Sequence, residues 1–206
     1  MLKLYYAPGT CARASHIALE EAGAAYTTER LDFKRNQQTS PEYLRVNPKG
    51  RVPALVTDRG VLTETPAVLA YIAQSFPQAR LAPLDDAYAF AQVQAFNSYL
   101  CSTVHVAHAH RVRGYRWATE ESSFADMKRM VPKTMGACFA LIERDMLKGP
   151  WVMGEQYTIC DPYLFALTGW LEGDGVDVAS LPRVMAHRQR MEQRPAVKKV
   201  LEDEKR

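Results

Sequence analysis

The stretch that most constrains the fold is Asn-Pro-Lys-Gly-Arg-Val-Pro-Ala-Leu at 47–55, with Thr-Glu-Thr-Pro at 63–66. Two turn dipeptides precede Pro53, which opens a short apolar run that predicts a strand. Proline is tolerated at a strand's first residue or edge, so the Val52 backbone stays free to pair with an added peptide. Glu64-Thr-Pro predicts a helix start, whose free N–H groups favour carboxylates. These features predict a site for a small acidic peptide; the alternative is a loop and hairpin that only complete a sheet.

Composition excludes several classes of function. Among 206 residues there are 26 basic and 23 acidic side chains, and the net charge of +3 favours neither nucleic acid nor a membrane surface. No run of about 18 apolar residues predicts a membrane span, and the start of the chain lacks the pattern of a secretory leader. The four cysteines are widely spaced and form no zinc pattern. We therefore expect a cytoplasmic protein with free thiols.

Cys11 differs from the other three cysteines, which lie in apolar helical segments typical of a core. Residues 2–7 predict a strand ended by Pro-Gly, after which Thr10 caps a helix that runs to Gly23. In the first turn of that helix, the dipole and Arg13 would lower the pKa of Cys11 and favour a reactive thiolate. A buried structural cysteine is the alternative. Because no second cysteine lies two residues on, a disulfide cycle would need an external thiol.

The order of the predicted elements indicates the fold of residues 1–77. A second strand at 26–32 is followed by a short helix that begins at Ser-Pro-Glu, 40–42. Strands at 53–57 and 61–63 then lead into a helix from about 65 to 74. This β-α-β-α-β-β-α order predicts a thioredoxin-like domain with a mixed sheet.

A second domain is predicted at 87–206, after a linker at 78–86. It carries no strand signal, and segments 88–117, 122–147, 161–171 and 181–200 all have helical patterns. The fold class is thus α/β plus all-α, with an all-helical C-terminal domain. Thr158 and Asp161 have the spacing of a capping box, which we interpret as a folding determinant rather than a catalytic pair.

Four motifs in order suggest a family. They are Tyr-Tyr-Ala-Pro-Gly-Thr-Cys at 5–11, Asn-Pro-Lys-Gly-Arg-Val-Pro at 47–53, Thr-Glu-Thr at 63–65 and the Thr158–Asp161 box. With the cysteine after Pro-Gly and Val104-His105 on the first long helix, the chain resembles the cytosolic glutathione transferases, and among them the bacterial beta class. The resemblance implies a homodimer that uses glutathione as co-substrate and no other cofactor.

The resemblance also implies how glutathione is held. A cis bond between Val52 and Pro53 would present the Val52 backbone to the cysteinyl part of glutathione. Glu64 and Thr65 match the positions that hold its γ-glutamyl end.

Further roles follow from the same resemblance. Cys11 matches the class cysteine, which lies beside the glutathione sulfur and forms a mixed disulfide with it. His105 matches the histidine that faces this thiol, and Ser102 lies one turn earlier on the same helix. For the glycyl carboxylate the candidates are Lys34 and Arg35, of which we select Arg35.

Two catalytic modes fit these residues. In the first, the helix start at Cys11 and a proton-transferring or imidazolium His105 stabilise the glutathione thiolate, which attacks a small hydrophobic electrophile. Tyr115, Trp117 and Phe124 are candidates for its pocket, although aromatic residues at helical spacing are mostly core. In the second mode, Cys11 is the nucleophile of a glutaredoxin-like thiol transferase. The residues do not choose between the modes.

Three other interpretations remain. The same fold supports a glutathione-dependent isomerase or dehalogenase, or a non-catalytic binding protein. A metal site is not predicted: His105 and His108 share a helix face, but no carboxylate or cysteine joins them at a useful spacing.

Overall fold

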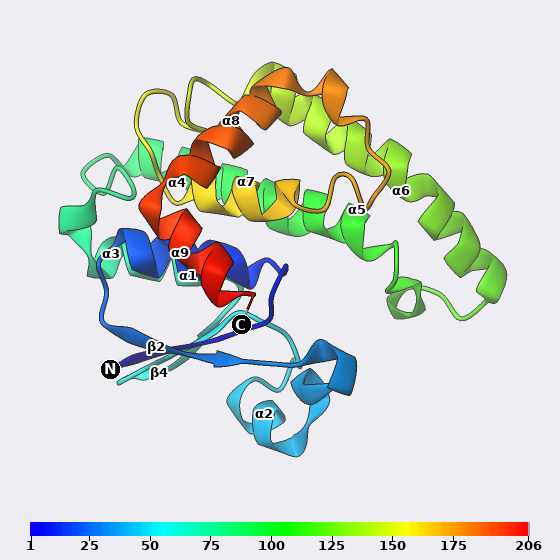
Figure 1. The fold of residues 1–206 in the computed structure, drawn as a ribbon, viewed down its shortest axis with the longest axis horizontal. Helices are drawn as coiled ribbons and strands as arrows, with labels where there is room; N and C mark the ends of the chain where they lie inside the picture. The colour runs from blue at the N-terminus through cyan, green and yellow to red at the C-terminus, as the bar shows by residue number, and fades with distance from the viewer. Residues whose placement is uncertain (206) are drawn as a thin grey trace.

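A four-stranded mixed sheet organises the N-terminal part of the computed structural model, which describes residues 1–205 (Figure 1). Its strands are β1 (Leu2–Tyr6), β2 (Tyr26–Arg30), β3 (Ala54–Thr57) and β4 (Gly60–Thr63), in the order β2-β1-β3-β4. Strand β1 is parallel to β2 and antiparallel to β3, which pairs antiparallel with β4. The predicted mixed sheet is confirmed.

Three helices complete this part of the chain: α1 (Ala12–Glu21), α2 (Pro41–Val46) and α3 (Thr65–Ser75). Helices α1 and α3 lie on the side of the sheet that faces the remaining helices, whereas α2 lies beyond the other side (Figure 1). The small and apolar residues of α1, among them Ala14, Ile17 and Ala18, are buried. Ser40 caps α2 by accepting a hydrogen bond from the Tyr43 amide at 3.2 Å. The predicted element order is confirmed.

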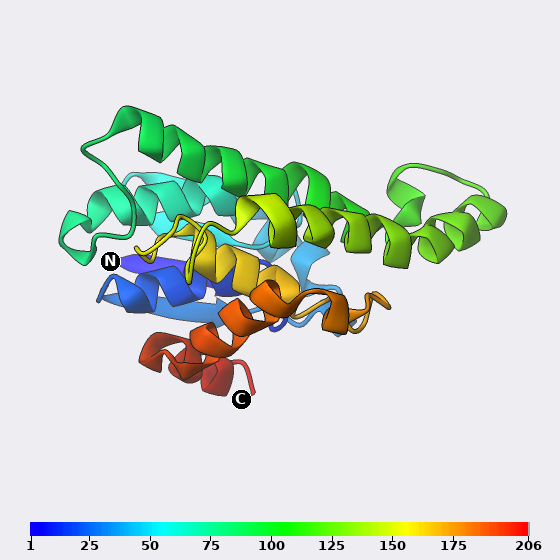
Figure 2. The same ribbon diagram turned by 90° about the horizontal axis from the view of Figure 1, so that it is seen from above.

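The rest of the chain is helical, as predicted, although the helix expected at 181–200 is divided in two at Arg194, before Pro195. It comprises α4 (Ala87–Tyr99), α5 (His105–Ala109), α6 (Glu121–Leu141), α7 (Cys160–Thr168), α8 (Pro182–Gln193) and α9 (Pro195–Asp203), with π-helical turns at Leu100–Val104 and Ile142–Met146. Figure 2 shows α4 and α5 continuing in one column beside α6. No helix in residues 1–205 is both long and apolar enough to cross a bilayer.

The helix expected at 88–117 is shorter than predicted. It contains the π-helical turn and ends at Ala109, after which the chain turns through a 3-10 helix at Gly114–Arg116. Gly114 packs so closely against α6 that an added Cβ would lie 2.9 Å from the Phe124 ring. A tertiary contact therefore decides where this turn lies.

The predicted capping box is present at the start of α7, in a more extended form. The Thr158 hydroxyl accepts from the Cys160 amide at 3.3 Å, and Asp161 accepts from the Thr158 amide at 2.7 Å. Asp161, which is fully buried, also accepts from the Val152 amide and contacts His187 Nε2 at 2.9 Å. These partners offset the cost of burying its charge, in keeping with a structural role.

Candidate active site

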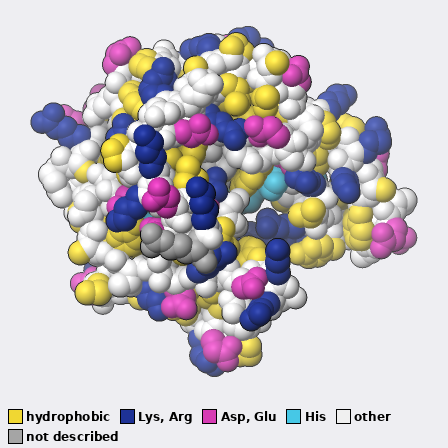
Figure 3. Space-filling view, in the orientation of Figure 1, with side chains coloured by type: hydrophobic (Ala, Val, Ile, Leu, Met, Phe, Trp, Pro, Cys, Tyr) yellow, Lys and Arg dark blue, Asp and Glu magenta, His cyan; other side chains and the backbone are white. Residues whose placement is uncertain are grey.

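A cleft of about 520 Å³ opens between the sheet domain and the helical domain. One wall comes from the loops before α1, β3 and α3, and the other from α5, the segment after it and α7. In Figure 3 a hollow is bordered by histidine, basic and hydrophobic side chains. Its lining includes six of the predicted site residues: Cys11, Val52, Pro53, Glu64, Thr65 and His105.

The Val52-Pro53 peptide bond is cis, as the sequence resemblance implied. Val52 lies just before β3, and its N–H has no hydrogen-bond partner within residues 1–205. Its carbonyl accepts a hydrogen bond from the Cys11 thiol, with Sγ at 3.5 Å. An extended peptide that paired with Val52 would therefore bring its own side chains close to the Cys11 sulfur.

Cys11 does not have the expected electrostatics. It precedes α1 rather than lying in its first turn, and it is buried. Burial raises the pKa of the Cys11 thiol to about 11, although the Thr65 hydroxyl and the positive charge of Arg113 act in the opposite direction. The predicted low pKa is wrong, because loss of hydration outweighs the favourable groups around the sulfur.

Arg13, which was expected to favour the Cys11 thiolate, pairs with a carboxylate instead. Its guanidinium pairs with Glu204, with Nη2 2.5 Å from Oε2, and the same carboxylate accepts from the Gly9 amide at 3.2 Å. From the helical domain, the Trp170 indole donates to the Gly9 carbonyl at 2.9 Å. The loop that carries Cys11 is thus held on both sides by residues close to the C-terminus and after α7.

His105 faces the same cleft as a neutral imidazole. Burial, followed by the charge of Arg113, lowers the pKa of His105 to about 4. The imidazolium considered from sequence is therefore not the form present near neutral pH. Its ring lies 5.0 Å from Trp170, which in turn stacks on His108 at 4.0 Å.

A buried carboxylate from a distant part of the sequence contacts His108, the second histidine of this helix face. Asp174, which is buried, contacts His108 Nδ1 at 2.7 Å and Arg111 at 3.3 Å. No group of three or more side chains suited to a metal ion occurs within residues 1–205. The arrangement orients His108 beneath Trp170.

On the wall of the cleft that comes from the sheet domain, Glu64 is the N-cap residue of α3 and Thr65 is the first residue of the helix. Glu64 has a positive φ of 71°, and its carboxylate lies 2.5 Å from Lys49 Nζ. Thr65 is buried at the first position of the helix. The free amides and positive dipole end expected of a helix start therefore adjoin the cleft.

Comparison with known proteins gives the family. The N-terminal domain model of glutathione S-transferases matches residues 1–74, and a C-terminal domain model matches residues 108–204. Glutathione S-transferase GstA of Escherichia coli O157:H7 is 31% identical, with 98% of each chain covered. The chain belongs to the glutathione S-transferase family.

Solved structures of other transferases agree with this assignment. A glutathione transferase homolog from Sulfitobacter, solved with bound glutathione, is 49% identical with a TM-score of 0.96, and 98% of each chain is covered. A beta class glutathione S-transferase from Sphingomonas chungbukensis is 33% identical with a TM-score of 0.86 over the same share of each chain. The domain boundaries at 77 and 87 stay predictions.

Two predicted site residues of this transferase lie outside the cleft. The exposed Arg35 faces Asp32, with Nε 3.6 Å from the carboxylate. Ser102 is also exposed, and its hydroxyl donates to the Ser98 carbonyl at 2.8 Å. Neither is among the residues that line the cleft beside Cys11, and their predicted contacts with glutathione stay predictions.

Other lining residues were not identified from sequence. Arg51, Arg113 and Trp170 line the cleft, and so does Cys101, which was interpreted as a core residue. Arg51 directly precedes Val52, a proximity that could have indicated its place. Arg113 and Trp170 carry no local signal, since only the packing of the helices brings them to the sheet domain. Cys101 gives this transferase a second thiol in the cleft, which the spacing of the cysteines did not predict.

Two of the three aromatic candidates line the cleft of the transferase. Tyr115 and Trp117 do so and are 65% and 46% exposed, whereas Phe124 packs against Gly114. Exposed aromatic rings beside a cleft are suited to contact an apolar ligand.

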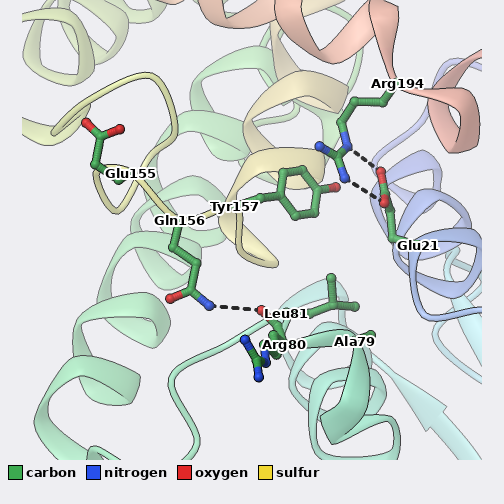
Figure 4. A pocket seen from close by; sticks show the side chains of 8 residues that line it. All are labelled: Glu21, Ala79, Arg80, Leu81, Glu155, Gln156, Tyr157 and Arg194. Carbon is green, nitrogen blue, oxygen red and sulfur yellow. Dashed lines mark hydrogen bonds and ion pairs between the residues drawn. The ribbon is translucent and has the colours of Figure 1, made fainter.

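A second hollow, of about 500 Å³, lies at the joint between the domains (Figure 4). Arg194 stacks on the Tyr157 ring at 4.0 Å and forms two hydrogen bonds with Glu21 of α1. Gln156 donates to the Arg80 carbonyl at 3.3 Å. The Arg194–Glu21 pair links the C-terminal helices to α1, so Arg194 is neutralised within the protein and acts at the contact between the domains.

Proposed function

We propose that this transferase binds glutathione along Val52 and joins its sulfur to a small electrophile. The supporting observation is the 3.5 Å separation between Cys11 Sγ and the Val52 carbonyl, next to a Val52 N–H with no partner in residues 1–205. A tripeptide added at this edge would place its central cysteinyl side chain close to Cys11 and His105. The solved Sulfitobacter relative holds glutathione, which favours the same ligand here.

The two ends of glutathione have matching groups in the cleft. The γ-glutamyl carboxylate would face the start of α3 at Thr65, and Glu64 would face its ammonium group. For the glycyl carboxylate we replace Arg35 with Arg51. The Arg51 guanidinium lines the cleft and forms no ion pair within residues 1–205. Arg35, in contrast, is exposed beside Asp32.

The ionisation states favour conjugation over thiol transfer near neutral pH. With a pKa of about 11, the Cys11 thiol keeps its proton and is suited to donate a hydrogen bond to a glutathione thiolate. A neutral His105 also offers a ring N–H, and Arg113 supplies positive charge at the sulfur. The conjugation step would be attack of this thiolate on the electrophile, after loss of the thiol proton to solvent.

Thiol transfer through Cys11 stays a second proposed activity. A relative named disulfide-bond oxidoreductase YfcG, from Escherichia coli, is 27% identical and covers 98% of this chain. The step would begin with attack of the Cys11 thiolate on a glutathione disulfide, releasing one glutathione thiolate and leaving a mixed disulfide. The raised pKa of Cys11 makes this activity slow at pH 7 and faster in alkali.

We also propose a homodimer, a cytoplasmic location and a role in detoxification, which the family resemblance implies. The glutathione-dependent isomerase stays an alternative. A maleylacetoacetate isomerase from Pseudomonas aeruginosa is 27% identical over 89% of this chain.

Retention on immobilised glutathione and conjugation of 1-chloro-2,4-dinitrobenzene test the main proposal. Arg51→Met should raise the KM for glutathione by about tenfold, since it removes a charged hydrogen bond. Arg35→Met is the matched control and should leave KM unchanged. A wild-type protein that is neither retained nor active would instead favour the non-catalytic binder.

The two activities are separated by Cys11→Ala, with Cys138→Ala as control. Incubation with oxidised glutathione followed by peptide mapping should give one adduct at Cys11 in the wild type and in the control. Cys11→Ala should lose this adduct and disulfide reduction, but only weaken conjugation. Equal loss of both activities would contradict the separate roles.

A further inference from the structure

The helical wall of the cleft combines aromatic rings with positive charge. Arg113, Tyr115, Arg116 and Trp117 all line it, in the segment between α5 and α6. Trp117 is supported from behind by the His110 ring at 4.4 Å, so one large aromatic side chain is held in place while exposed. This wall lies across the cleft from the peptide-pairing edge at Val52.

Arg113 and Arg116 have no counterion among the residues that the structure describes. Neither guanidinium forms an ion pair or hydrogen bond with another side chain or carbonyl within residues 1–205. Burial, and then the neighbouring charge of Arg116, lowers the pKa of the half-buried Arg113. Arg116 is exposed, and its like charge beside the half-buried Arg113 makes the partly desolvated Arg113 costly without an anion nearby.

Three other arginines of this chain form ion pairs with acidic side chains. Arg13, Arg188 and Arg194 each lie within 2.6 Å of a carboxylate oxygen. Among the described residues that line the cleft, the only acid is Glu64, which belongs to the other wall and is already paired with Lys49 at 2.5 Å. The helical wall therefore offers uncompensated positive charge next to apolar surface.

We propose that the electrophile used by this transferase carries an anionic group, such as a carboxylate, on a flat apolar body. Arg113 and Arg116 would bind the anion, and Trp117 and Tyr115 would contact the body. This inference rests on the proposed conjugation and specifies its second substrate. It adds an anionic group to the small hydrophobic electrophile expected from sequence.

A pair of aryl chlorides tests the charge once the intrinsic reactivity of each is divided out. In 1-chloro-2,4-dinitrobenzene and 4-chloro-3-nitrobenzoate, a nitro group lies ortho to the chlorine; the para substituent is nitro in one and carboxylate in the other. In both, the glutathione thiolate forms a C–S bond at the chlorine-bearing carbon, and chloride leaves with the electron pair of the C–Cl bond. The thiol proton passes to solvent, so no other reactant is needed.

The readout is the ratio of kcat/KM for the benzoate to that for the dinitrobenzene, each first divided by its uncatalysed rate with glutathione. We expect this ratio to exceed 10 in the wild type at low salt and to fall with added salt. Arg113→Met and Arg116→Met should each lower it about tenfold, while Arg116→Lys should retain much of it. Arg59→Met, at the exposed turn between β3 and β4, removes the same charge elsewhere and should leave the ratio unchanged.

A binding measurement keeps the test independent of turnover. Calorimetry with the two S-aryl glutathione products should show tighter binding of the carboxylated one, and Arg116→Met should abolish the difference. If the protein conjugates neither electrophile, the proposed function fails, and the product-binding difference still decides whether the anion site exists.

Three results would overturn the inference. One is a wild-type ratio near 1 with equal product affinities. The second is a higher KM for glutathione in both methionine variants with an unchanged ratio, which would assign the arginines to a carboxylate of glutathione. The third is an unchanged ratio in the methionine variants together with an equal shift of the pH profile of kcat/KM for both electrophiles. That result would show that Arg113 and Arg116 act on the thiolate alone.

Discussion

The indole N–H of Trp170 donates a 2.9 Å hydrogen bond to the carbonyl of Gly9, two residues before Cys11. It links the segment after α7 to the loop that presents the thiol, although the two residues are 161 positions apart. Trp170 also stacks on His108 and lies beside His105, so one ring contacts both walls of the active-site cleft.

Trp170→Phe should reduce kcat/KM for conjugation about fivefold, because it removes a hydrogen bond worth about 1 kcal/mol while keeping an aromatic ring. Steady-state kinetics with varied glutathione would measure this effect. Trp151→Phe is the control, since Trp151 packs against Tyr157 and His187 away from the cleft. If both variants had wild-type kcat/KM, the hydrogen bond to Gly9 would not position the loop.

The raised pKa of Cys11 predicts an alkaline reactivity profile. With a pKa of about 11, about one thiol in ten thousand is ionised at pH 7, and this fraction rises about tenfold per pH unit. Alkylation of Cys11 by iodoacetamide, followed by peptide mass mapping, should therefore accelerate up to at least pH 10. A rate that levels off below pH 8 would mean that Cys11 is a thiolate near neutral pH.

His105 predicts a loss of stability in mild acid. Its pKa is about 4 in the folded protein and near 6.5 when unfolded, so the unfolded chain binds more protons between these values. Stability contributed by the neutral ring is present above pH 6.5 and falls as pH decreases toward 4, by at most about 3 kcal/mol.

The comparison of wild type with His105→Gln isolates this contribution. Urea unfolding at pH 7.5 and pH 5 should show a smaller loss of unfolding free energy for the variant than for the wild type. Identical losses would indicate that His105 titrates alike in both states. His16 has a pKa lowered in the same direction by burial, so only the difference between the proteins carries the result.

Local chemistry in the sequence determined much of the fold and part of the site. Pro53, the Ser40-Pro41 helix start and the small residues of α1 act within a few positions of themselves, and the predicted element order is confirmed. Motif order along the chain identified the family, and it pointed to Cys11, Val52, Thr65 and His105, which share one cleft.

Only the tertiary structure determined the pKa of Cys11 and the residues that form the helical wall of the cleft. Dipole and spacing arguments favoured a Cys11 thiolate, but the pKa depends on how completely packing removes water from the sulfur, which no local pattern encodes. Arg113, Arg116 and Trp170 come from segments about 100 to 160 residues away from Cys11, and only helix packing brings them to it. The motifs therefore identified Cys11 and the peptide-pairing edge at Val52. Long-range packing determined the protonation state of the thiol and the positive charge around it, because desolvation and Coulomb interactions depend on distance in space.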